Sequence, residues 1–292
     1  ILKREHIPYS TETDIIPIIE RWNISLLLFD GLNEDEGLFE LVKKRLPEVK
    51  IIAMGYFDYD NQYVDAIINL VNHNPWKLRP DVAHIQYYEG LQYAIVRDEF
   101  QRFMGEKRVI PKVAKNILIT FGGADVSGNT EKTVRMLAQA GVSDLNLDIV
   151  LGLYFDNETT IANLLHTMCY KAHIHRSVSN MADHIFGADL AFCGGGMTAI
   201  EMLSVGTPAI IIPQNSREER FASRLDQCGA VKLLSNSASF DENIADLSMI
   251  LCSAEKRKIM IEAGRALIDG RGMERICDII THILKGTPRF FN

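Results

Sequence analysis

Short apolar runs alternate along the chain with longer stretches in which apolar residues recur at helical spacing. The first pattern is typical of buried strands and the second of amphipathic helices. Such alternation predicts an α/β protein, with parallel sheets whose right-handed crossovers place helices on both faces. The predicted strands are 24–29, 49–54, 66–70, 93–96, 116–121, 147–151, 172–175, 188–192, 209–212 and 230–233, and the predicted helices are 34–46, 130–140, 158–168, 180–186, 198–206 and 218–227, followed by two or three more.

A charged stretch at 97–112 interrupts the alternation and is predicted to be an interdomain linker. At 292 residues the chain is long enough for two domains of roughly 100–200 residues each. We therefore predict one parallel-sheet domain over residues 1–105 and a second over residues 106–292.

The most distinctive segment reads CGGGMTAIEMLSVGTPAIIIP at 193–213. Its three glycines lie between a predicted strand and a predicted helix. Free N–H groups and the positive end of a helix dipole make such a turn an anion site, and glycine lets a phosphate approach closely. Thr198 and Glu201 also have the spacing of a capping box, so the segment fits an ordinary helix cap as well.

A second glycine turn, Gly122-Gly123, follows the predicted strand 116–121. Ligands of parallel sheets bind at the carboxyl ends of the strands, so we expect both turns at the same edge of one sheet. The chain has neither the dinucleotide fingerprint G-x-G-x-x-G nor the lysine of a Walker loop. The two turns therefore indicate phosphate binding outside the usual NAD enzymes and P-loop ATPases.

Composition narrows the range of partners and compartments. The net charge of −7 argues against a nucleic-acid partner, for which a basic face is expected. No apolar run approaches the ~20 residues of a membrane span. The five cysteines are widely spaced without a C-x-x-C pair, which fits a reducing cytoplasm and excludes the usual structural zinc spacing. We expect a cytoplasmic protein.

Several polar residues fit both a functional and a structural interpretation. Asp125 could orient a sugar hydroxyl or a water, or it could cap the next helix. Arg217 could reach a sugar or phosphate, or it could lie with Glu218 in a solvated first helical turn. His173 and His175 lie two apart on a strand and so share one face, but no third ligand stands nearby in the sequence, and no metal is expected.

Longer segments resemble GT-B nucleotide-sugar enzymes. The run SVSNMADHIFGADLAFCGGGMTAIEMLSVGTPAIIIP, followed by RFASRLDQCGAVKLL, resembles the C-terminal domain of MurG-type transferases. The segments ILITFGGAD and GLQYAIVRDEF resemble the first C-domain strand and the interdomain sequence of a closer group. That group contains the UDP-sugar hydrolases of the pseudaminic acid pathway and the spore-coat polysaccharide glycosyltransferase-like proteins. The likeness covers roughly residues 24–235.

This resemblance implies two Rossmann-like domains that face a cleft, with a UDP-sugar as the ligand. Gly196 and Met197 would offer backbone N–H groups to the diphosphate, and Gly195 of the same turn is counted among the substrate-binding residues. Thr198 would add its hydroxyl, and the Gly122-Gly123 turn would let the sugar or a phosphate lie against it. Helix dipoles would neutralise the phosphates, so no divalent metal or other cofactor is expected.

The resemblance also implies contacts with the nucleoside. Glu201 would accept hydrogen bonds from the ribose hydroxyls. Val178 would read the uracil edge through its backbone. The Asn-Gln pair that the family carries after its last apolar strand is replaced by Arg217-Glu218. Glu218 therefore joins the expected substrate-binding residues, and Arg217 and Asp125 are the catalytic candidates.

One part of the family pattern has no match in this chain. The family begins with a loop G-x-G-H-x-x-R, whose histidine is the expected general base of the hydrolases. We therefore expect an incomplete N-terminal domain, with about 50–70 further residues ahead of Ile1 as a covalent segment or as a partner chain.

The sequence thus predicts a UDP-sugar-binding GT-B protein of surface-glycan or nonulosonic acid biosynthesis. The first hypothesis is a nucleotide-sugar hydrolase that releases UDP. The alternatives are a glycosyltransferase with a UDP-sugar donor and a non-catalytic binding module of a longer protein.

Overall fold

The computed structural model describes residues 15–31, 36–55, 62–70, 84–168, 170–234 and 239–285. The chain divides into two compact units, Ile1–Tyr93 with Gly272–Asn292, and Ala94–Arg271. Helix α11 (Gly272–Lys285) belongs to the first unit because it packs against the short 3-10 helix η2 (Leu91–Tyr93) and against β2. From the sequence, residues 106–292 were predicted to form one domain. None of the helices in the described part of the chain combines the length and the apolar composition of a membrane span.

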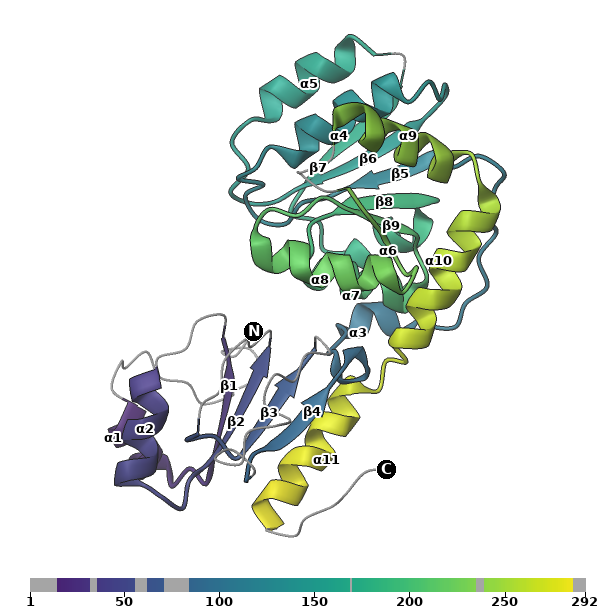
Figure 1. Ribbon diagram of the computed structural model, residues 1–292. Coiled ribbons are helices and arrows are strands. Elements are labelled where there is room, and N and C mark those ends of the chain that lie inside the picture. The colour runs from purple at the N-terminus through teal and green to yellow at the C-terminus, as the bar shows by residue number, and fades with distance from the viewer. Residues whose placement is uncertain are drawn as a thin grey trace. The chain divides into compact units, whose positions relative to one another are not determined.

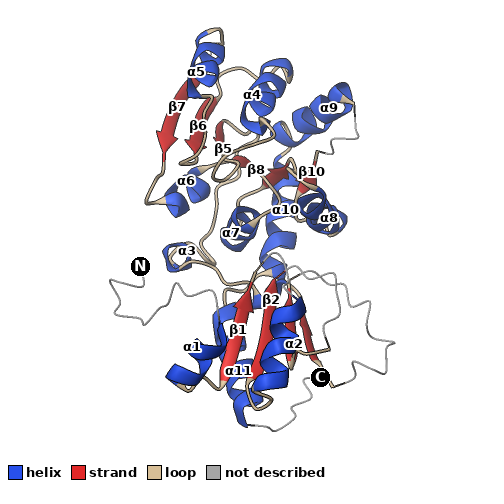
Figure 2. Cartoon of the chain, turned by 90° about the vertical axis from the view of Figure 1, so that its left-hand side faces the viewer, coloured by secondary structure: helices blue, strands red, loops and turns tan. Residues whose placement is uncertain are grey.

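The first unit is built on a parallel sheet in the order β1-β2-β3-β4. Helices α1 (Ile15–Trp22) and α2 (Glu36–Arg45) pack on one face, and α11 lies on the other (Figures 1 and 2). The strands are β1 (Leu26–Asp30), β2 (Lys50–Gly55), β3 (Ala66–Asn69) and β4 (Gln86–Glu89).

Two elements of this unit differ from the sequence prediction. Helix α1 was not predicted. The strand predicted at 93–96 is wrong, and the fourth strand is β4, which lies upstream of it. Gly90 ends β4 in a backbone conformation with φ of 113°, which favours glycine, and the chain then turns into η2.

The second unit contains a parallel six-stranded sheet in the order β10-β9-β8-β5-β6-β7. Figures 1 and 2 show helices α4, α5 and α9 on one face and α6, α7, α8 and α10 on the other. A short helix, α3 (Asp98–Gln101), lies in the segment that was predicted to be a linker. The strands are β5 (Asn116–Ile119), β6 (Asn146–Leu151), β7 (Lys171–Arg176), β8 (Leu190–Cys193), β9 (Ala209–Ile211) and β10 (Lys232–Leu233), and the helices are α4 (Asn129–Gln139), α5 (Glu158–His166), α6 (Met181–Gly187), α7 (Met197–Val205), α8 (Ser216–Gln227), α9 (Phe240–Leu251) and α10 (Ala254–Leu267).

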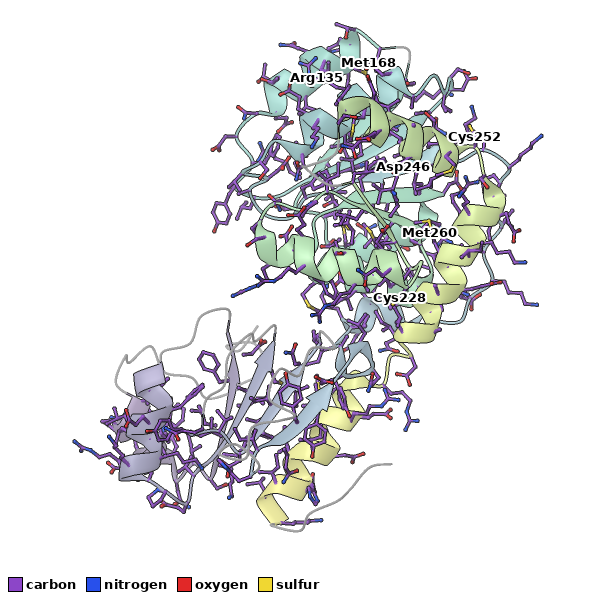
Figure 3. The ribbon with its side chains drawn as sticks, in the orientation of Figure 1. Arg135, Met168, Cys228, Asp246, Cys252 and Met260 are labelled. Atoms are coloured by element: carbon purple, nitrogen blue, oxygen red, sulfur yellow. The ribbon has the colours of Figure 1, made fainter. Side chains whose placement is uncertain are left out.

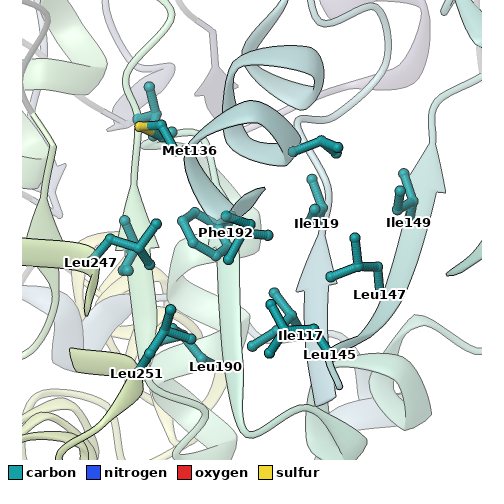
Figure 4. Packing of buried hydrophobic residues seen from close by; sticks show 14 of the residues in the cluster. Ile117, Ile119, Met136, Leu145, Leu147, Ile149, Leu190, Phe192, Leu247 and Leu251 are labelled. Atoms are coloured by element: carbon teal, nitrogen blue, oxygen red, sulfur yellow. The ribbon is translucent and has the colours of Figure 1, made fainter. Parts of the chain in front are cut away.

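Alternation along the strands of this sheet decides which side chains enter the main core. Ile117, Leu147 and Ile149 belong to the buried cluster under α4 and α9, where Phe192 and Leu247 also pack (Figure 4). Segments distant in the chain contribute to the same cluster: Met260 of α10 is one of its buried residues, and Met168, which follows α5, packs against it (both are labelled in Figure 3). Residues at the intervening strand positions, Asp148 among them, point to the opposite face, which α6 covers.

Candidate functional site

The strand order of the second unit has a topological switch point between β5 and β8. The chain runs outward from β5 through β6 and β7 and then returns to β8 on the other side of β5. Open α/β sheets bind ligands at the carboxyl ends of the strands beside such a point. Gly122-Gly123 follows β5 and Gly194–Gly196 follow β8. The prediction that both turns lie at one edge of the same sheet is confirmed.

The three glycines after β8 have different surroundings. A Cβ on Gly195 would lie 2.7 Å from the carbonyl oxygen of Glu218, and one on Gly194 would lie 2.9 Å from Oε2 of Glu218. These two glycines therefore allow α8 to pack closely against the turn. A Cβ on Gly196 would meet no atom within 4 Å, so the turn is open at this position.

Gly196 is the N-cap residue of α7, which begins at Met197. The capping box suggested by the spacing of Thr198 and Glu201 is therefore wrong, because Thr198 already lies within the helix. The N-cap residue supplies no side-chain hydrogen bond, and the first turn of α7 carries no acidic residue. The positive end of this helix thus faces the open side of the turn without an acidic side chain of its own.

The carboxylate of Glu201 is held by Arg97. Arg97 Nε and Nη2 donate to its two oxygens at 2.6 and 3.0 Å, and the side chain of Glu201 is only 6% exposed. Arg97 also pairs with Glu99 at 2.8 Å and lies over the ring of the buried Phe100. Arg97 was not among the predicted site residues, although it is the arginine of the segment GLQYAIVRDEF, which was a signal for it.

Glu218 links the turn after β8 to α8. Its Oε2 accepts from the N–H of Gly195 at 3.0 Å and from the N–H of Gln214 at 2.9 Å. Gln214 in turn donates through Nε2 to the carbonyl of Phe121 at the end of β5, at 3.1 Å. Glu218 and Gln214 therefore tie the two glycine turns together. Gln214 was not predicted, and its only signal was its place between a strand end and a helix.

The turn after β5 is shaped by close backbone packing. Gly122 has a φ of +75°, and a Cβ on Gly152 would lie 2.1 Å from the carbonyl oxygen of Gly122. Asp125 follows this turn, and its two carboxylate oxygens accept from the N–H groups of Asn129 and Thr130, both at 2.8 Å. These bonds to the first turn of α4 match the helix-capping alternative for Asp125.

The remaining predicted residues lie along the same edge of the sheet. Val178 is half-buried in the segment between β7 and α6 and follows Ser177, whose φ is +49°. Met197 is 45% exposed, and Thr198 is half-buried beside it. Arg217 is half-buried in the first turn of α8. Every predicted substrate-binding residue is thus at or after a strand end of the second unit.

Cys193 ends β8 directly before the glycines and is fully buried. Burial raises the pKa of its thiol, and the carboxylates of Glu218 and Glu201 raise it further. A protonated, inaccessible thiol does not act as a nucleophile. The chemistry of this edge therefore rests on backbone N–H groups, hydroxyls and charged side chains.

Two units with parallel sheets, the second with glycine turns at its switch point, define a GT-B-like α/β protein. Comparison with known proteins agrees with this class. No family model matches the chain. MJ1062, an uncharacterized protein of Methanocaldococcus jannaschii, is 28% identical over 290 residues, which are 94% of this chain and 54% of that protein. The chain thus spans about half the length of this relative.

A second relative is the spore coat polysaccharide biosynthesis protein SpsG of Bacillus subtilis. It is 27% identical over 274 residues, covering 91% of this chain and 79% of SpsG. Among solved structures, MurG of Acinetobacter baumannii matches with a TM-score of 0.69 at 16% identity, over 96% of this chain and 86% of MurG. The UDP-bound structure of MnaA from S. aureus matches with a TM-score of 0.65 at 13% identity, over 94% and 81% of the two chains. These matches confirm the resemblance to GT-B glycosyltransferase-like proteins.

Proposed function

We propose that this chain binds a UDP-sugar at the carboxyl edge of its second sheet and transfers the sugar in the synthesis of a polysaccharide. The observation that carries the proposal is the turn at Gly196. It stands at the switch point, opens toward the N-terminus of α7 and has space where a Cβ would be. The likeness to SpsG and to a UDP-bound structure of the same fold supports the choice of ligand.

The diphosphate would lie against the first turn of α7. Backbone N–H groups of Gly196 and Met197 and the hydroxyl of Thr198 are the donors available there. As the sugar–phosphate bond breaks, negative charge grows on the departing phosphate, and oriented N–H groups with the helix dipole stabilise that charge. Such a site can carry out the transfer without a divalent metal.

Glu201 would bind the ribose through the carboxylate lone pairs that do not accept from Arg97. An ionised carboxylate has about four lone-pair sites, and Arg97 uses two of them. The guanidinium also holds the carboxylate in place. In this arrangement Arg97 is a positioning residue, and Glu201 makes the contact with the nucleotide.

Hydrolysis is the second candidate, because segments such as GLQYAIVRDEF resemble the UDP-sugar hydrolases. The test is to incubate the chain with a panel of UDP-sugars and to measure UDP and free sugar. Release of UDP that depends on an added sugar acceptor supports transfer. Release of UDP with an equal amount of free sugar, independent of acceptor, indicates hydrolysis instead. Tight UDP binding without release of UDP from any UDP-sugar would reject both transfer and hydrolysis and would indicate a non-catalytic binding module.

A further inference from the structure

Two imidazoles and one carboxylate converge on the face of the second sheet that α6 covers. Asp148 comes from β6, His175 from β7 and His184 from α6. Asp148 Oδ1 lies 2.9 Å from Nε2 of His175, and Asp148 Oδ2 lies 2.5 Å from Nδ1 of His184. All three side chains are partly buried, and one potential ligand atom from each lies within 4.8 Å of the others.

We propose that Asp148, His175 and His184 form a zinc site. Nitrogen and oxygen ligands bind Zn²⁺ at about 2.0–2.1 Å, so ligand atoms of a tetrahedral ion stand about 3.3 Å apart. The observed spacing is close enough for small side-chain rotations to reach that geometry. Two histidines with one carboxylate are an established zinc ligand set in which a further position stays open.

Space for an additional ligand exists beside the cluster. A cavity of about 300 Å³ is lined by Asp148, His184 and His173, among other residues. The ring of His173 lies 6.5 Å from that of His175 and is exposed. A water molecule in the cavity, or His173 after a rotation, would complete four-coordination.

No metal was expected from the sequence, because no third ligand stands near His173 and His175 along the chain. Asp148 and His184 are distant from them in the chain, and only the pairing of β6 with β7 and the packing of α6 bring them together. The predicted common face of His173 and His175 is confirmed, since both rings lie on the α6 side.

The position of the cluster indicates what the ion would do. His175 is in the strand before residues 177–180, and His184 is in the helix after them. One ion would therefore connect both ends of this short segment to β6. It would stabilise the edge strand β7 and would not take part in the site at the glycine turns after β5 and β8.

Zinc titration of the purified full chain against a chromophoric chelator tests the proposal. We expect one equivalent to bind, with the affinity reduced at least about 100-fold in His175→Ala and in His184→Ala. His166→Ala is the matched control, because His166 is exposed at the end of α5, and it should bind zinc as the unchanged chain does. Zinc should raise the melting temperature of the unchanged chain and of His166→Ala only. Circular dichroism without zinc checks that each variant folds.

Two results would overturn the zinc site. One is the absence of zinc binding at micromolar concentration, or equal zinc affinity in all three variants. Either would mean that Asp148, His175 and His184 form carboxylate–imidazole hydrogen bonds and no zinc site. The other is loss of zinc binding after alkylation of the exposed cysteines Cys228, Cys252 and Cys277, which would assign the ion to sulfur. Cys228 and Cys252 are labelled in Figure 3. Neither result depends on whether the chain binds UDP.

Discussion

At the scale of single residues, the ion pair between Arg97 and Glu201 adds a structural contact to the predicted ribose-binding residue Glu201. Glu201 was expected to meet ribose or to take part in a capping box, and its carboxylate lies buried against a guanidinium. The partners are distant in sequence, so no local pattern could pair them. A buried carboxylate with lone pairs to spare, fixed by a fork of donors, is nevertheless suited to receive ribose hydroxyls.

Comparison of UDP with 2′-deoxy-UDP tests this role of Glu201. We expect the unchanged chain to prefer UDP by about tenfold, as for one hydrogen bond to a charged group, and Glu201→Gln to lose that preference. Glu99→Gln is the control, because Glu99 also pairs with Arg97 and should leave the preference intact. The measurement is calorimetric titration of each variant with both ligands.

Glu201→Gln also breaks the bond with Arg97, so its free energy of unfolding should fall by about 1–3 kcal/mol. If it weakened UDP and 2′-deoxy-UDP by the same factor, Glu201 would be a structural residue, and the ribose contact would be rejected.

At the scale of elements, Asp65 holds the first sheet and α2 together. It precedes β3, and its carboxylate accepts from Lys43 on α2 at 2.6 Å, from Lys50 on β2 at 3.0 Å and from the N–H of Ile51 at 2.9 Å. Burial by itself would raise the pKa of Asp65, but the hydrogen bonds from Lys43, Ile51 and Lys50 together hold that pKa below its ordinary value of 3.8. The charged form of Asp65 therefore stabilises the fold.

The pH dependence of this contribution has a definite sign. Because the folded pKa is lowered, the stabilisation is complete above the unfolded value near pH 4 and is lost as the pH falls through the folded value. Asp65→Asn should lower the free energy of unfolding by about 1–3 kcal/mol at pH 7, and the difference should shrink toward pH 3. Urea unfolding across this range measures it, with the exposed Glu48→Gln as control. A difference that stayed constant with pH would contradict the assignment.

The elements differ in how well the sequence predicts them. Strands that are buried over all or nearly all of their length, such as β8 and β5, stand out as apolar runs between glycines or polar turns, and they were predicted. The strand β4 reads QYYE and is half-buried throughout, so it lacks an apolar run and was missed. The start of α7 was misjudged because Thr198-x-x-Glu201 has the spacing of a cap, whereas the N-cap is the glycine before Met197.

At the scale of the whole molecule, the alternation of strands and helices was enough to predict the α/β class and the edge that carries both glycine turns. The division of the chain into units was harder to predict. Helix α11 follows the helices of the second unit in sequence, but it packs on the first unit. The contacts that join Asp125 to α4 and Gln214 to Phe121 depend on the folded arrangement of loops, and no sequence pattern predicted both partners.

For the site as a whole, we propose that the open turn at Gly196 receives the diphosphate of a UDP-sugar. Calorimetric titration with UDP, compared between the unchanged chain and Gly196→Ala, tests it most directly. The backbone of Gly196 has a φ of −102°, and an added Cβ meets no atom within 4 Å, so the variant should keep its melting temperature. Gly187→Ala is the matched control, since its Cβ likewise meets nothing within 4 Å.

We predict that the unchanged chain and Gly187→Ala bind UDP equally and that Gly196→Ala binds it at least about tenfold more weakly, which corresponds to about 1.4 kcal/mol. Absence of UDP binding by the unchanged chain at millimolar concentration, or equal UDP affinity in Gly196→Ala, would show that the turn at Gly196 does not bind the diphosphate.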